Sequence, residues 1–165
     1  MTGEPLHVLF LCPDNACRSI MAEALLNTVG QGRFCAFSAG NRPSGAVNPY
    51  VIETLKQVGY DTSGLFSKNW NTFTVPSAAR LDAVVTLAAS LQSALLPVWY
   101  SNPVHVHWGM DNPEQVEGGD RERIGAYRRC YGDMEQQMLK FAGLKIDGVR
   151  GPALLRLLQS IAPAR

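Results

Sequence analysis

A cysteine and an arginine separated by five residues are the pair in this sequence best suited to act together chemically. Cys12 and Arg18 enclose the segment Pro-Asp-Asn-Ala-Cys, and Ser19 follows directly. A thiolate is a strong nucleophile, and a guanidinium group can bind two oxygens of an anion at once. The Ser19 hydroxyl can donate a hydrogen bond to the thiolate. This arrangement predicts nucleophilic attack by Cys12 on a tetrahedral oxyanion, either phosphate or arsenate.

The spacing between the two residues also predicts an anion-binding loop. Five intervening residues allow the backbone to curl so that successive N–H groups point inward, at the positive end of the helix that follows. The same positive field is expected to lower the pKa of Cys12 below its free value. Asn15 is expected to adopt a left-handed conformation and to hold the loop with its side chain. The predicted oxyanion-binding residues are Pro13, Asp14, Asn15, Ala16, Cys17 and Arg18.

The surrounding sequence decides between this interpretation and a simpler one. A cysteine and an arginine at this spacing also occur by chance, and a buried cysteine after a strand is usually a small core residue. Here residues 6–11 form a continuous apolar run, as expected of a strand buried on both faces of a parallel sheet, and residues 20–29 favour a helix. Open parallel sheets bind ligands beyond the carboxyl ends of their strands, which is where residues 12–19 fall. The context therefore favours the functional interpretation.

The rest of the chain predicts an α/β fold of one domain over residues 1–165. Strands and helices alternate, which predicts a three-layer sandwich around a four-stranded parallel sheet. The core is expected to span about residues 6–142, followed by a C-terminal helical extension over about residues 146–165. The further strands are predicted at residues 33–38, 81–87 and 103–107, and the further helices at residues 48–58, from Asp120 onward, and at 152–161.

The long helix has a clear apolar pattern. Asp120 is expected to cap it, and its apolar residues recur at steps of three and four, which predicts one stripe packed in the core. The stripe consists of Ile124, Tyr127, Tyr131, Met134, Met138 and Phe141.

Composition limits the functional classes. A net charge of +1 gives no indication of nucleic acid or of an acidic membrane surface as a partner. The four cysteines match no zinc signature and no disulfide scaffold. The apolar run at residues 6–11 is too short for a signal peptide core or a membrane span. We therefore expect a cytoplasmic protein in a reducing environment.

Several other residues have two interpretations. Cys17 could form a reversible disulfide with Cys12, or it could be a packed thiol under the loop. Cys35 and Cys130 are expected to be structural. His105 and His107 share one face of a strand but have no thiol or carboxylate partner at the spacing of a metal site, so no metal is predicted. Two more residues are ambiguous: Ser38 is expected either to support the loop, through Asn15, or to cap a turn, and Trp108 either to line the substrate mouth or to close the core.

Several segments together resemble a known family. Residues 8–24, from Val8-Leu9-Phe10-Leu11-Cys12 through Met21-Ala22-Glu23-Ala24, resemble the opening of the low-molecular-weight protein tyrosine phosphatases and of the arsenate reductases built on the same fold. Other segments resemble the arsenate reductase branch more closely. They are Phe37-Ser38-Ala39-Gly40, Val47-Asn48-Pro49, Gly59-Tyr60-Asp61-Thr62-Ser63-Gly64, Val84-Val85-Thr86-Leu87, Pro97-Val98-Trp99 and His107-Trp108-Gly109. The resemblance covers roughly residues 6–142.

The resemblance implies that Cys12 attacks the substrate. In phosphatases of this family the adduct is a phosphocysteine that water hydrolyses, and in the arsenate reductases thiols reduce an arseno-cysteine adduct and release arsenite. This sequence departs from the family at two points. Ala88 and Leu96 stand where thioredoxin-coupled reductases carry relay cysteines. Asn112 stands before Pro113, where the family has an aspartic acid, and an amide cannot act as a general acid. Asp111 is the candidate replacement, although a shift of one residue usually misaims a side chain.

These observations predict a cysteine-dependent oxyanion enzyme. The favoured reaction is reduction of arsenate, with Cys12, Arg18, Ser19 and Asp111 as catalytic residues and Asn15, Ser38 and Asn112 in support. No bound cofactor is expected, and an external thiol such as glutathione, with a glutaredoxin-like partner, would be the reductant. The alternatives are a phosphatase acting on phosphotyrosine proteins or aryl phosphates, and a non-catalytic oxyanion-binding protein.

Overall fold

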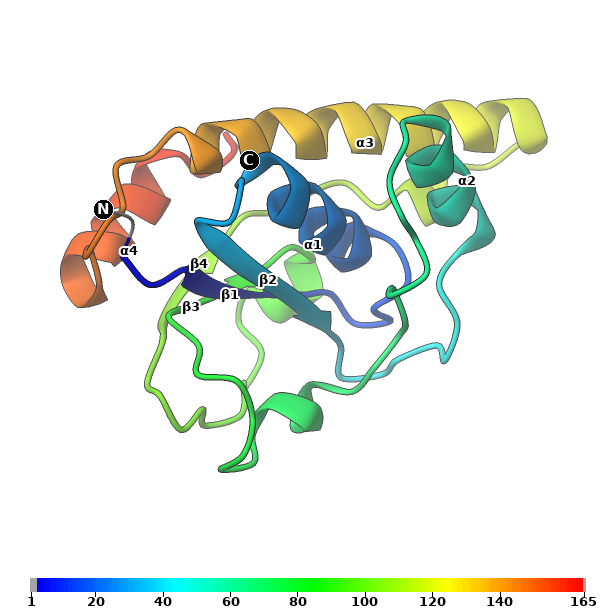
Figure 1. The fold of residues 1–165 in the computed structure, drawn as a ribbon. Coiled ribbons are helices and arrows are strands. Elements are labelled where there is room, and N and C mark those ends of the chain that lie inside the picture. Colours follow the sequence, from blue (N-terminus) through cyan, green and yellow to red (C-terminus); the bar gives the residue numbers. More distant parts are fainter. Residues whose placement is uncertain (1–2, 165) are drawn as a thin grey trace.

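The computed structural model describes residues 3–164 and is built around a parallel four-stranded sheet (Figure 1). Its strands are β1 (Leu6–Leu11), β2 (Phe34–Ala39), β3 (Ala83–Thr86) and β4 (Val104–His107), in the spatial order β2-β1-β3-β4. Because β1 pairs with both β2 and β3, the segment after Leu11 leaves from the interior of the sheet at its carboxyl edge. This edge is the expected position of a ligand site in an open parallel sheet.

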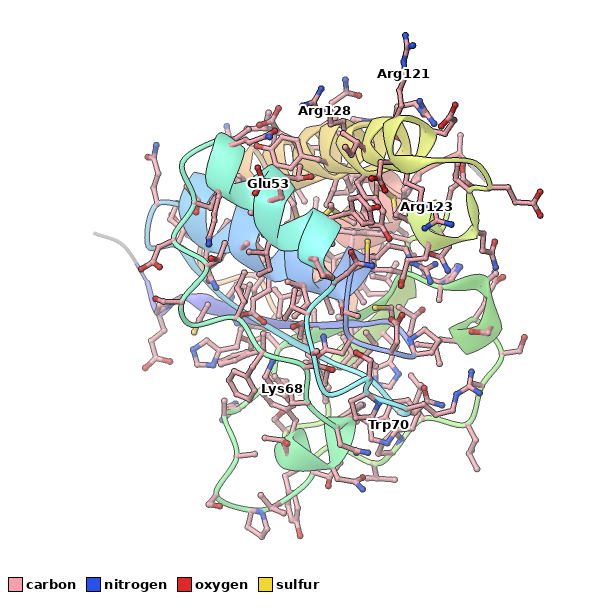
Figure 2. The ribbon with its side chains drawn as sticks, turned by 90° about the vertical axis from the view of Figure 1, so that its right-hand side faces the viewer. Glu53, Lys68, Trp70, Arg121, Arg123 and Arg128 are labelled. Atoms are coloured by element: carbon pink, nitrogen blue, oxygen red, sulfur yellow. The ribbon has the colours of Figure 1, made fainter. Side chains whose placement is uncertain are left out.

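Helices cover one face of the sheet. They are α1 (Arg18–Val29), α2 (Pro49–Gln57), α3 (Asp120–Ala142) and α4 (Gly151–Ser160). The long helix α3 crosses above α1, and α2 lies against α3 near its N-terminal half (Figure 1). Figure 2 shows Arg121 and Arg128 extending from α3, and both side chains are exposed. The opposite side of α3 contributes its apolar residues to the core.

The two faces of the sheet bury different sets of residues. Alternate side chains of β1 point to opposite faces, so Val8 packs under the helices and Leu9 packs on the other side. The second face is covered by two irregular stretches of chain. One precedes β3 and contains the 3₁₀ turn η1 (Trp70–Phe73), and the other lies between β3 and β4 and contains the 3₁₀ turn η2 (Ala89–Leu91). The third layer of the predicted sandwich is therefore irregular chain rather than helix.

Most predicted elements are present, with differences at their ends. The helix α1 begins at Arg18 rather than at residue 20, so the functional loop is shorter than predicted. Gly119, not Asp120, is the N-cap of α3, and the Gly119 N–H donates to the Glu122 carboxylate at 3.0 Å. The predicted cap at Asp120 was wrong because Glu122 closes the end of the helix from inside, which leaves Asp120 as its first residue.

The apolar stripe of α3 is only partly buried. Tyr127, Met134, Met138 and Phe141 are buried, while Tyr131 is half-buried and Ile124 is exposed. Ile124 lies near the start of the helix, opposite α2 rather than over the sheet, and borders a cleft between the two helices. The prediction that Ile124 packs in the core was therefore wrong.

The C-terminal helix α4 packs into the main core. Leu154 and Leu158 are fully buried there, and the Trp108 indole N–H donates to the Leu158 carbonyl at 3.0 Å. Trp108 itself is fully buried and contacts the Phe141 ring edge to face. Of its two interpretations, Trp108 closes the core.

No helix within residues 3–164 combines the length and the apolar character needed to cross a membrane. In the same part of the chain, no group of three or more His, Cys, Asp or Glu side chains is arranged to hold a metal ion.

Candidate active site

Cys12 is the first residue after β1 and is fully buried. Its Sγ lies 2.8 Å from the Ser19 hydroxyl oxygen and accepts the Ser19 backbone N–H at 3.4 Å. Ser19 belongs to the first turn of α1, so the sulfur lies at the positive end of that helix. The loop and the helix together hold the sulfur in one position.

Asn15 holds the loop in its curled form. It is buried, and its φ of 46° is the left-handed conformation that the sequence predicted. Its amide nitrogen donates to the Ser19 hydroxyl at 2.8 Å, and its amide oxygen accepts the Lys68 backbone N–H at 2.8 Å. Because the Ser19 oxygen accepts from Asn15, its own proton is free to point at the sulfur of Cys12.

The loop carbonyls point outward and so direct the loop N–H groups inward. The carbonyl of Pro13 accepts from Arg42 at 2.8 Å, and that of Ala16 accepts from Asn48 at 3.0 Å. The Asp14 carbonyl likewise accepts the N–H of Ser44 at 2.9 Å. In a trans peptide the C=O and N–H point in opposite directions. The N–H groups of residues 14, 15 and 17 therefore face the interior of the loop, where an anion would bind.

Arg18 closes the loop as the first residue of α1. Its side chain is 7% exposed, and one of its terminal nitrogens donates to the Met110 carbonyl at 3.2 Å. The buried Nε–H has no acceptor among the residues that the structure describes. An unpaired buried donor costs about 1–3 kcal/mol, so this group is a candidate for binding an oxyanion.

The pKa of the Cys12 thiol is raised rather than lowered. Burial is the largest cause, because an apolar environment disfavours the thiolate, and the nearby Asp14 carboxylate acts in the same direction. The hydrogen bonds from Ser19 and the charge of Arg18 act against these effects without overcoming them. The predicted lowering was therefore wrong, since the sequence could not show how completely the sulfur is enclosed.

Ser38 on β2 and Lys68 on the segment after α2 support the loop. The Ser38 hydroxyl donates to the Glu23 carboxylate at 2.6 Å, while Lys68 Nζ donates to the Ser38 carbonyl at 3.0 Å and lies 3.8 Å from Glu23. Figure 2 shows Lys68 and Trp70 on the segment that follows α2. The predicted bond between Ser38 and Asn15 was wrong, because the side-chain oxygen of Asn15 accepts the backbone N–H of Lys68 instead.

The segment of residues 108–112, which we call the acid loop, follows β4. Asp111 is exposed and lines a cavity of about 240 Å³ between this loop and α3. Asn112 caps the 3₁₀ turn η3 (Pro113–Gln115), since its side-chain oxygen accepts the Glu114 N–H at 3.0 Å. Asn112 thus has a structural bond, and the catalytic role of Asp111 stays a prediction.

Glu114 is a residue of the site that the sequence did not indicate. Its carboxyl group lies near that of Asp14 in the loop and accepts from the Asn48 side chain at 3.3 Å. Desolvation of the carboxyl group and the neighbouring Asp14 raise the pKa of Glu114 to about 7, although the residue as a whole is exposed, and the charge of Arg18 only partly offsets this effect. Residue spacing gives no signal for this contact, because Glu114 reaches the loop only after the fold brings η3 against it.

Cys17 is buried under the loop as a free thiol, in agreement with one of its two interpretations. It lies beside Cys130 of α3, which is also buried. Cys35 lies on β2 and is half-buried. Ala88, two residues after the end of β3, is buried and Leu96 is half-buried, so neither relay position carries a thiol.

Known proteins are similar to this chain in sequence and in fold. An arsenate reductase of Halalkalibacterium halodurans is 33% identical over 135 residues, covering 82% of this chain and 94% of the relative. A glutaredoxin arsenate reductase of Synechocystis sp. is 29% identical over 131 residues, covering 79% of this chain and 92% of the relative.

Solved structures agree with these relatives. The crystal structure of an arsenate reductase from Archaeoglobus fulgidus has a TM-score of 0.67 and 26% identity, covering 83% of this chain and 99% of that one. An arsenate reductase in the phosphate binding state has a TM-score of 0.63 and 28% identity, covering 83% of this chain and 96% of that one.

A buried cysteine under an anion-binding loop on this fold defines a cysteine-dependent oxyanion enzyme. The chain matches the low molecular weight phosphotyrosine protein phosphatase family over residues 7–149 and belongs to it.

Proposed function

We propose that this enzyme reduces arsenate to arsenite through a covalent adduct on Cys12, with an external thiol as the reductant. The observation that carries the proposal is the buried pair of Cys12, held by Ser19, and Arg18, whose Nε–H has no acceptor among the described residues. The names of the relatives support arsenate as the substrate.

The loop would bind arsenate before any bond changes. Inward-facing N–H groups and the Arg18 guanidinium stabilise the charge that develops on the equatorial oxygens. Because the pKa of Cys12 is raised, its thiol must lose a proton before attack, and a basic substrate oxygen or the Asp14 carboxylate, 3.6 Å from the sulfur, can accept it.

The chemistry would then proceed in two stages. The Cys12 thiolate forms an S–As bond, and one As–O bond breaks to release water once its oxygen is protonated. A glutathione thiolate next attacks the Cys12 sulfur. The S–S bond forms as the S–As bond breaks, and the electron pair stays on arsenic and yields arsenite. A second thiol, glutathione or one carried by a glutaredoxin-like partner, reduces the resulting mixed disulfide.

A direct assay tests this proposal. Reduced protein is incubated with arsenate and glutathione, and arsenite is quantified by liquid chromatography with elemental detection. We expect arsenite formation that requires Cys12, so that Cys12→Ser is inactive and Cys35→Ser, on the half-buried β2 position, is unaffected. Arsenite formation that persists in Cys12→Ser would contradict the proposal.

A second candidate is hydrolysis of aryl phosphates through a phosphocysteine. Glu114 favours it, because a carboxylic acid beside Asp14 and half-protonated near pH 7 could donate the leaving-group proton that Asn112 cannot. Release of p-nitrophenol from p-nitrophenyl phosphate, lost in both Cys12→Ser and Glu114→Gln, would support this reaction. Phosphate and arsenate binding without either turnover would indicate a non-catalytic oxyanion-binding protein.

A further inference from the structure

Two cysteines other than the nucleophile Cys12 lie beside each other in the structure. Cys17 precedes α1 as its N-cap and is 1% exposed, and Cys130 lies on α3 and is 7% exposed. The two side chains are close enough for each thiol to shift the pKa of the other, and both cysteines are reduced. Two thiols in contact, far apart in sequence, are the arrangement from which a disulfide can form.

The pair also connects the loop to the outside. Cys17 lies close enough to Cys12 that the charge of the Cys12 thiolate disfavours a second thiolate at Cys17. On its other side, Cys130 lines the cavity of about 240 Å³, together with Asp111, Arg129 and Asp133. The three cysteines therefore run from the buried loop to a cavity that a reducing thiol can enter.

The pKa values of the two thiols are shifted in opposite directions. The contact with Cys17 lowers the pKa of Cys130, and the charge of Arg18 acts in the same direction, while burial of Cys130 opposes both effects. The same contact, with burial, raises the pKa of Cys17. Cys130 is thus the thiol that ionises first, and it can take the proton of Cys17 when Cys17 attacks.

We propose that Cys17 and Cys130 form a redox-active dithiol that accepts the oxidation from the Cys12 adduct and passes it to an external thiol at the cavity. This inference rests on the proposed arsenate reduction. The dithiol would take the place of the relay cysteines that are missing at Ala88 and Leu96. The external thiol would then react at Cys130 rather than at Cys12.

The steps balance in atoms and electrons. Cys130 first loses its proton to solvent in the cavity that it lines. Cys17 then attacks the sulfur of Cys12 and passes its own proton to the Cys130 thiolate. The S–As bond breaks, arsenic keeps the electron pair, and arsenite leaves. Cys130 then loses its proton and attacks the sulfur of Cys17, which expels the Cys12 thiolate and forms the Cys17–Cys130 disulfide. Two thiols have been oxidised and arsenic has gained two electrons, and an external dithiol reduces the disulfide.

Tryptic peptides distinguish the two disulfides. Cys12 and Cys17 share the peptide of residues 1–18, whereas Cys130 lies in the peptide of residues 130–140. A Cys12–Cys17 disulfide stays within the first peptide, and a Cys17–Cys130 disulfide joins the two. The Cys12→Ser variant removes the remaining ambiguity, because the only thiol left in the first peptide is then Cys17.

The first measurement needs no arsenate. Wild-type and Cys12→Ser proteins are equilibrated in dithiothreitol buffers of increasing oxidised fraction, alkylated, digested and analysed by mass spectrometry. We expect the joined peptides in both proteins and not in Cys130→Ser, with Cys35 alkylated throughout as the control. Failure of Cys12→Ser to give the joined peptides would overturn the dithiol.

The second measurement follows a single turnover without external thiol. Reduced wild-type protein given excess arsenate should release about one arsenite per chain and accumulate the joined peptides. Cys17→Ser should release none, and Cys130→Ser should release arsenite but retain the Cys12–Cys17 disulfide. With a dithiol reductant, turnover by Cys130→Ser should fall roughly tenfold or more, while Cys35→Ser keeps the wild-type rate.

The outcomes separate this inference from the function on which it rests. Arsenite that forms only with added glutathione, at equal rates in wild type and Cys130→Ser, would overturn the relay and leave the reductase in place. No arsenite under any condition would overturn the proposed function, while the dithiothreitol titration would still report whether the dithiol exists. Thermal unfolding of each variant shows whether the substitution has disturbed the fold.

Discussion

The reactivity of Cys12 depends on a balance between burial and hydrogen bonding. Burial raises the pKa of its thiol, and the hydroxyl and backbone N–H of Ser19 oppose that effect. Ser19 can play this part because Asn15 donates to its oxygen and orients the hydroxyl toward the sulfur. A single hydroxyl thus contributes directly to the amount of thiolate available.

Replacing Ser19 with alanine should therefore raise the pKa of Cys12 further. Hydrogen bonds to charged groups are worth about 1.5–3 kcal/mol, so we expect turnover to fall roughly 10- to 100-fold at neutral pH. The pH dependence of Cys12 alkylation by iodoacetamide measures the pKa directly. Ser160→Ala, at an exposed position of α4, is the matched control. An alkylation profile that does not move toward higher pH would contradict the role of Ser19.

Glu114 makes a separate prediction about pH and stability. The pKa of Glu114 in the folded protein is about 7, above the ordinary value of 4.5. Between pH 4.5 and pH 7 the folded state therefore keeps a proton on Glu114 that the unfolded state has lost. Stability from this group is complete below about pH 4.5 and is lost as the pH rises through 7. In Glu114→Gln that loss should disappear. Urea unfolding of both proteins between pH 5 and pH 8, under roughly constant ionic strength, tests this expectation, and parallel pH profiles for the two proteins would count against it.

The loop after β1 depends on close support from the end of β2. Gly40 follows β2, and a side chain there would overlap the carbonyl oxygens of Cys12 and Pro13. Its N–H and C=O are both bonded, to the Lys68 carbonyl at 3.0 Å and the Trp70 N–H at 2.8 Å, so the glycine cannot easily move away. The backbone of this segment fixes the start of the loop.

Gly40→Ala should therefore displace the loop. Overpacking of this kind typically costs about 1–3 kcal/mol, and we expect weaker binding of phosphate, used as a non-reacting oxyanion, by isothermal titration calorimetry. Gly64→Ala is the control, since that position has open space around it and an ordinary backbone conformation. Equal phosphate affinity in the two variants would show that the loop does not rely on this contact.

The sequence was sufficient for the elements that have a strong local pattern. The apolar run at residues 6–11, the Asn48-Pro49 start of α2 and the period of α3 each indicated an element close to where it lies. The irregular third layer was not predictable, because its residues lack a period and are held by packing on the sheet.

The candidate site divides in the same way. The loop residues between Cys12 and Ser19 are neighbours in sequence, so their spacing was informative. Glu114 reaches Asn48 across 66 residues, Lys68 reaches Asn15 across 53, and Arg18 reaches Met110 across 92. Contacts of this length depend on the packing of α3 and the acid loop against α1. No pattern in the sequence specifies them, and the pairing of Cys17 with Cys130 was missed for the same reason.

The C-terminal helix α4 completes the core of the whole molecule. It lies beyond residues 7–149, the part of the chain that matches the family. Leu154 and Leu158 enter the core beside Trp108, and the Gln137 side chain donates to the Ile161 carbonyl at 2.8 Å. Trp108 begins the segment that leads to Met110 and Asp111. The helix therefore stabilises the end of β4, from which the acid loop starts.

Leu158→Ala should reduce the stability of the whole fold while leaving the chemistry of the loop intact. Truncation of a fully buried leucine typically costs about 2–5 kcal/mol, and the Trp108 hydrogen bond, made to the backbone of Leu158, is retained. Gln159→Ala, at the next and exposed position, should have almost no effect. Urea unfolding measures the difference, and the iodoacetamide profile of Cys12 in the folded variant should stay at its wild-type position. A Leu158→Ala protein as stable as Gln159→Ala would show that α4 only rests on the surface, whereas a shifted Cys12 profile would show that its packing reaches the loop.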